Sequence, residues 1–162
     1  MAVTTNTATR RQVDVPGGNV GHANSPRVLV ATVELAASDS SSTISFGKIP
    51  SNARVLQASK VYWDDLATSG SPTLDLGFKA VNANITTDDD ALNDGLALSA
   101  VSTANVGAFV VKDIVNAGLP AWDFVNGQTS DPGGLLEVLG TVRDAATTAT
   151  GTVTLELHYI PG

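Results

Sequence analysis

The clearest pattern along the chain is an alternation of apolar and polar residues with a period of two. It is sharpest in the segment 151–160, GTVTLELHYI, where every second residue from Val153 to Tyr159 is apolar and the residues between are polar. Successive side chains of a strand point to opposite sides, so this alternation predicts a β-strand with one buried face. The segments 41–47 and 72–79 carry the same signal, and the segment 134–144 is predicted as a further strand.

The segment 27–36, RVLVATVELA, differs because its first half is apolar on both faces. One face carries an apolar residue at every second position from 29 to 35. The other face is apolar at Val28 and Val30 and becomes polar at Thr32 and Glu34. We therefore expect the first half of this strand to be covered on both faces.

The segment 49–66, IPSNARVLQASKVYWDDL, changes phase within its length. Leu56 and Ala58 share one face, whereas Val61 and Trp63 lie on the other. A bulge near Ser59 would bring both pairs to one side. The alternative is a strand that is buried first on one face and then on the other.

Three segments have a different rhythm and predict short helical inserts. In 86–99, TTDDDALNDGLALS, capping residues precede three acids, as at a helix start, and Gly95 ends the segment. The segments 111–118 and 119–127 each predict one or two helical turns that end at glycine. In SDPGG, 130–134, a type II turn is expected around Pro132 and Gly133.

These elements predict an all-β protein. Six or seven strands without βαβ alternation favour an antiparallel β-sandwich, jelly-roll-like, or an open barrel. Residues 27–162 are expected to form the β-sandwich domain. Residues 1–26, which are polar and lack a periodic apolar pattern, predict an extended N-terminal arm: either a flexible terminus or a segment that lies on a partner subunit.

Composition narrows the function classes. Nine basic residues against 16 acidic ones give a net charge of −7, so a nucleic-acid partner is not expected. There is no cysteine, which removes disulfides, thiolate metal sites and cysteine nucleophiles. No apolar run has the length of a signal peptide or of a membrane span, so a soluble protein without a membrane partner is expected.

Candidate catalytic chemistry is sparse. The two histidines are His22, in the predicted arm, and His158, on the polar face of the last predicted strand. No G-x-S-x-G segment exists to present a serine, so we expect no enzyme, no catalytic residue and no cofactor. An EF-hand starting at Asp88 fails, because Leu92 and Asn93 stand at its fifth and sixth positions. Helix capping is the preferred explanation of these acids, and calcium in an irregular loop remains the alternative.

The two tryptophans, Trp63 and Trp122, have two interpretations. In a chain with only 5% aromatic residues they are expected to anchor the core. Exposed tryptophans on a β-sandwich would instead stack against sugar rings, which would favour a carbohydrate-binding module.

Several segments together resemble small structural proteins of tailed-bacteriophage virions, of the capsid decoration or accessory head protein type. The resemblance rests on FGKIPSNARVLQASKVYWDDL, TLDLGF, DALNDGLAL, AGLPAWDFVNG, DPGGLLEV and ATGTVTLELHYI, which cover about residues 28–160. It implies a β-sandwich body, homo-oligomers with a trimer as the first expectation, and attachment to the shell of the major capsid protein. The corresponding location is the capsid surface of the virion, after assembly in the host cytoplasm. The alternative is a carbohydrate- or receptor-binding module of a head fibre or tail.

The residues agree with an interaction role. A sandwich leaves edge strands that must be protected, and pairing across a symmetric oligomer does so. Mean hydropathy is +0.12, which favours apolar surface buried between copies. Candidate contact residues lie in the predicted arm and on the doubly apolar strand: Val13, Val15, Val20, Arg27, Val28 and Val30.

Overall fold

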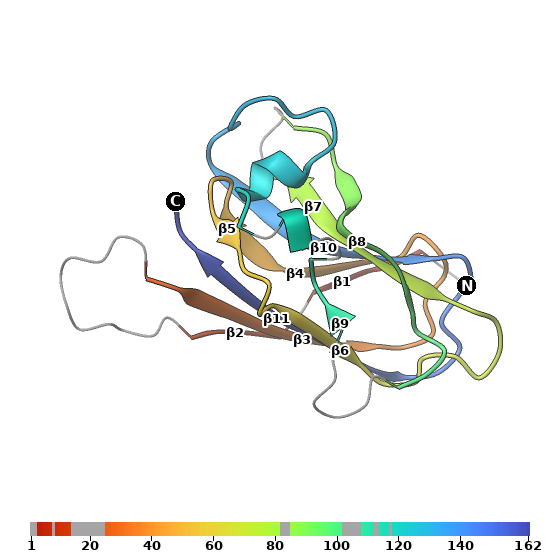
Figure 1. The fold of residues 1–162 in the computed structure, drawn as a ribbon. Helices are drawn as coiled ribbons and strands as arrows, with labels where there is room; N and C mark the ends of the chain where they lie inside the picture. Colours follow the sequence, from red (N-terminus) through yellow and green to blue (C-terminus); the bar gives the residue numbers. More distant parts are fainter. Residues whose placement is uncertain are drawn as a thin grey trace.

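Two β-sheets pack face to face in the computed structural model, which describes residues 3–7, 9–13, 25–81, 85–101, 108–111, 114–116 and 118–162 (Figure 1). Sheet A has the strand order β1 (Thr5–Thr7), β4 (Thr43–Pro50), β10 (Leu135–Arg143), β7 (Thr73–Ala80), β8 (Asp88–Ala97). Sheet B has the order β2 (Thr9–Val13), β3 (Arg27–Leu35), β11 (Gly151–Ile160), β6 (Lys60–Trp63), β9 (Ala108–Phe109), and β5 (Arg54–Val55) also pairs with β11. The predicted all-β sandwich is confirmed.

The connections pass back and forth between the sheets. β3 and β4, β6 and β7, and β10 and β11 are consecutive pairs whose members lie in different sheets, whereas β7 and β8 are neighbours in sheet A. Among the described pairs β1 runs parallel to β4, and the others are antiparallel. The segment 145–150 therefore crosses between the sheets, and the two strands that it joins do not form a hairpin. Turn residues alone do not reveal which sheet the next strand joins.

The residues predicted by period two to face inward form the core between the sheets. The burial of this set is nearly complete, which confirms the predicted faces of four strands. These residues are Leu29, Ala31, Val33, Leu35, Ile44, Phe46, Leu74, Leu76, Phe78, Val153, Leu155, Leu157 and Tyr159.

The phase change in the segment 49–66 is a turn between β5 and β6. Val55 pairs with Tyr159 and Lys60 with Glu156, so residues 56–59 lie opposite only two residues of β11. Ser59 Oγ binds this turn to β11: it accepts a hydrogen bond from His158 N at 2.9 Å and donates one to His158 O at 3.1 Å. A turn between two strands thus stands where a bulge within one strand was predicted: Val55 and Val61 are buried on either side of it, whereas Ala58 is exposed.

The segment 86–99 is a strand, so the predicted helix start is wrong. β8 pairs with β7 at the edge of sheet A, with register shifts on both sides of the pair Leu76–Asn93. Leu92 and Asn93 are buried there. Pairing with a neighbouring strand supplies backbone hydrogen bonds, and it outweighs the local capping preference of the threonines and acids.

Helical inserts occur where 111–127 predicted them, as two 3₁₀ turns. They are η1 (Ile114–Asn116) and η2 (Ala121–Phe124). Gly118 and Gly127, the predicted stops, have φ of +86° and +78°. Gly133 has φ of +70°, as the predicted type II turn requires at its third position.

Two described segments of the predicted arm lie in the sheets. β1 pairs with β4 through residues 5–7, and β2 pairs with β3 through residues 9–13. The chain thus lines the same side of both sheets before β3 begins (Figure 1). The division into an arm, 1–26, and a body stays a prediction.

Candidate functional site

Two of the predicted contact residues lie on the outer face of sheet B. Val28 and Val30 are half-buried on that face of β3, and Arg27 at its start is exposed. Their cross-strand neighbours on β11 are His158 and Glu156. We call the pair Val28 and Val30 the valine face. On the other side of β3, Val13 in β2 lies opposite Val28. Val15 and Val20 lie outside the described residues.

His158 lies next to this valine face and is held by an acid. Its ring Nε2 lies 2.8 Å from Glu156 Oε1, two residues earlier on the same face of β11. Ser59 Oγ bonds to the backbone N–H and C=O of His158. The arrangement fastens the strand and does not place a serine nucleophile against the imidazole. His22 lies outside the described residues.

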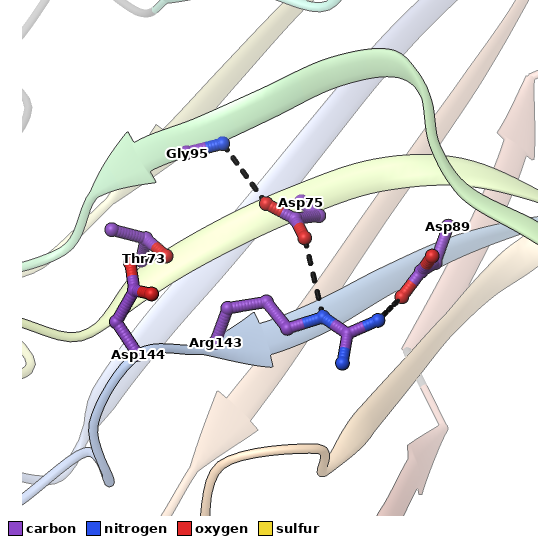
Figure 2. Close-up of polar contacts among 6 residues, drawn as sticks. All are labelled: Thr73, Asp75, Asp89, Gly95, Arg143 and Asp144. Carbon is purple, nitrogen blue, oxygen red and sulfur yellow. Dashed lines mark hydrogen bonds and ion pairs between the residues drawn. The ribbon is translucent and has the colours of Figure 1, made fainter.

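A second group of charged side chains lies on the outer face of sheet A, between β10, β7 and β8 (Figure 2). Arg143 Nε donates to Asp75 Oδ2 at 3.3 Å, and Arg143 Nη2 forms an ion pair with Asp89. The other oxygen of Asp75 accepts from the backbone N–H of Gly95 at 2.9 Å. Asp75, at 7% exposure, is a buried charge that is compensated on both oxygens.

This group ties the irregular strand β8 to the rest of sheet A. Asp89 and Gly95 lie on either side of Asn93, where the register of β8 shifts. Gly95 is bound to Asp75 of β7, and Asp89 is bound to Arg143 of β10. Asp88 also has a partner, since its Oδ2 accepts from Asn126 N at 2.6 Å. The acids that suggested helix capping thus hold a strand in place. Calcium in an irregular loop was the alternative explanation of these acids, and the described acids form no group of three or more that could hold a metal ion.

Replacing Arg143 by methionine tests the group. The variant R143M keeps an unbranched, flexible side chain but leaves the carboxylate of Asp75 buried without its cation, which costs stability. Because the Arg143 side chain is 42% exposed, solvent screens part of this effect. We expect a loss of about 1–2 kcal/mol, seen as a Tm lowered by about 2–6 °C in a thermal melt.

The control is the double variant R143M/D75N, which removes the buried charge together with its partner. We expect it to be more stable than the sum of the two single effects, because the single effects share one interaction. Strict additivity of the two substitutions would show that the ion pair contributes nothing.

The tryptophans are neither fully buried nor free on the surface. Both are partly buried and pack against the core from its rim. Trp63 Nε1 donates to Ala100 O at 2.8 Å, so the polar end of this indole is bound within the chain. Such placement is closer to the predicted anchor than to an open platform for a sugar ring.

The described part of the chain contains no group of three or more His, Cys, Asp or Glu side chains arranged to hold a metal ion. No helix in that part is long and apolar enough to cross a membrane.

Comparisons with known proteins give one informative likeness. No family model matches the chain, and no curated protein matches its sequence. A solved structure, the cyanophage Pam1 capsid asymmetric unit, contains a chain of similar fold with a TM-score of 0.61 and 20% sequence identity. The match covers 94% of this chain and 94% of that chain. The likeness shows that the two chains share one fold over nearly their full length.

Proposed function

We propose that this protein is a structural component of a phage virion, which decorates or cements a capsid shell through protein–protein contacts as a homo-oligomer. The observation that carries the proposal is the fold shared with a chain of the cyanophage Pam1 capsid asymmetric unit over 94% of both chains.

The surface chemistry supports the same role. The valine face presents two β-branched residues on the outer side of sheet B, where a soluble strand ordinarily carries polar side chains. The charged groups that the structure places near one another, His158 with Glu156 and Arg143 with Asp75 and Asp89, bind within the chain. We propose no enzymatic activity, and we propose the major capsid protein as the partner.

A binding experiment tests the proposal. Particles of the parent phage that lack this protein are mixed with the purified chain, sedimented and imaged by cryo-electron microscopy. We expect co-sedimentation and added density at regular positions on the shell. Absence of binding to such particles, together with absence of the chain from the complete virion by mass spectrometry, would refute the proposal.

Charge on the valine face is expected to weaken these contacts. The double variant V28E/V30E places two carboxylates where an apolar contact is proposed, and burying them against a partner is unfavourable. Because both valines are already half-exposed, the fold should survive. We expect at least about tenfold weaker binding in the particle sedimentation assay, with little change in Tm.

The matched control is T32E, one position further along the same face of β3 and also half-buried. It should bind more nearly like the unmodified chain. Equal binding by V28E/V30E and the unmodified chain would remove the valine face from the interface.

A further inference from the structure

An apolar row and a basic row lie side by side at one end of the outer face of sheet A. Leu135 faces Pro50 of β4 in register, and by the same register it lies beside Val81, which directly follows β7. Leu135 is 44% exposed and Val81 is 45% exposed, although both are large apolar residues. One step along the strands, Glu137 lies between Lys48 and Lys79, and both lysines are exposed. We call these residues, Lys48, Lys79, Val81 and Leu135, the basic patch.

The basic patch stands out because the chain as a whole is acidic. It places two lysines together with one acid on a protein that has 16 acidic and nine basic residues. Opposite charge beside exposed apolar surface is the combination that favours a specific contact over non-specific association. The patch is therefore suited to a partner surface that is both acidic and apolar.

The same chain presents such a surface at the end of β6. Asp64 and Asp65 follow Trp63 and are both exposed. The indole of Trp63 is bound to Ala100 O, which brings the next residue, Val101, to the same rim, and Val101 is 55% exposed. We call Asp64, Asp65 and Val101 the acidic patch. Asp64 also accepts from Thr152 N and Oγ1, at 2.7 and 2.8 Å, so its carboxylate is held in position.

The two patches lie at opposite ends of the sandwich. Trp63 pairs with Val153 near the start of β11, so the acidic patch belongs to that end. β4 ends at Pro50 and leads through residues 51–53 into β5, which pairs with the last residues of β11. The basic patch therefore belongs to the other end. In Figure 1 the last residues of β6, next to the acidic patch, and the last residues of β7, next to the basic patch, likewise lie at opposite ends of the sandwich.

From this placement we infer that copies of this chain associate head to tail, the basic patch of one copy binding the acidic patch of the next. The inference deepens the proposed function, on which its biological role rests, by naming the contact that joins the copies. A contact between two different surfaces of one chain is heterologous, so it generates a closed ring where the rotation between copies closes. A trimer is one such ring.

Charge reversal in the purified chain tests the inference without any particle. The association of the unmodified protein is measured by size-exclusion chromatography with light scattering, and Tm is measured for every variant. The variant K48E/K79E and the variant D65K should each weaken association by about 100-fold, because each brings like charges together. The combined variant K48E/K79E/D65K should restore association, since attraction between the patches returns with opposite sign.

Two matched controls separate the contact from total charge and from surface polarity. D123K reverses an exposed acid on η2, outside both patches, and should associate like the unmodified chain. L135E should dissociate the oligomer, whereas V115E, at a residue that is 82% exposed on η1, should not.

Three results would overturn the head-to-tail contact. They are an unmodified chain that is monomeric at every concentration tested, reversed variants that associate normally, and a combined variant that stays dissociated although it is folded. Because particle binding is measured separately, an oligomer that dissociates as expected but never binds a shell would refute the proposed function and leave the head-to-tail contact standing.

Discussion

Replacing Gly77 by alanine is expected to abolish the native packing of β8 on β7. A Cβ built on Gly77 would lie 2.1 Å from the backbone oxygen of Asp88 and 2.5 Å from the carbonyl carbon of Asp89. No side-chain rotation can relieve a clash with backbone atoms, so β8 would have to move away. That movement would pull Asp89 from Arg143 and Gly95 from Asp75. We expect G77A to lose about 4 kcal/mol of stability, which corresponds to a Tm lowered by about 10 °C.

Two other glycines provide the controls for G77A. A Cβ on Gly140 would meet side-chain atoms of Phe46 and Leu74 at 3.0 and 3.2 Å, and these can shift by small rotations. Gly95 has open space around it but a φ of +75°, so G95A would suffer only backbone strain. Thermal melts should rank the losses with G77A clearly largest. A Tm for G77A within the range of the other two would mean that β8 does not approach Gly77 so closely.

The faces of the long strands could be predicted from the sequence because burial acts on each residue separately. Leu74, Leu76 and Phe78 alternate with polar residues, and the structure buries these three. The same alternation puts Asp75 on the outer face. It does not bring Asp75 to Arg143, because the two residues lie 68 residues apart and their contact depends on the register between β7 and β10. Period two determines which face a residue occupies, and it contains no information about register.

The elements that were mispredicted are those whose form is decided by their neighbours. The acids of β8 resemble a helix start locally, yet the free edge of β7 offers hydrogen bonds to a strand. β1 and β2 are short and show no alternation, so only pairing with β4 and β3 makes them strands. The basic patch was hidden for the same reason, since Lys48 and Lys79 flank Glu137 only after two registers are set.

The role of the aromatic residues in the core could be predicted only in part from the sequence. With four phenylalanines and two tryptophans, the chain has few large side chains for its core. Among the residues whose burial the structure describes, Phe46 and Phe78 are the largest fully buried side chains, whereas both tryptophans remain at the rim, so the expected anchoring falls mainly on phenylalanine. An indole has one N–H that needs a partner, and the rim allows Trp63 to reach a backbone carbonyl while its ring packs inward.

Truncation of Phe78 is the second change with a large expected effect. Phe78 is fully buried on β7, and its ring meets that of Phe124 edge to face, with the centroids 6.4 Å apart at an interplanar angle of 60°. The contact joins sheet A to η2, which covers the core at that point. F78A removes the ring and leaves a cavity between the two elements, and we expect a loss of about 3–5 kcal/mol of stability, measured by chemical denaturation.

A double-mutant cycle separates the ring contact from the loss of volume. F78L and F124L each keep an apolar side chain, so each should cost clearly less than F78A. If the edge-to-face pair contributes beyond area burial, the two leucine variants should show a coupling energy of about 0.5–1.5 kcal/mol. A coupling near zero, with F78A still strongly destabilised, would mean that Phe78 acts through core volume alone. η2 would then be held by its backbone bonds, from Ala121 N to Ala53 O at 2.7 Å and from Trp122 N to Ser51 O at 3.0 Å.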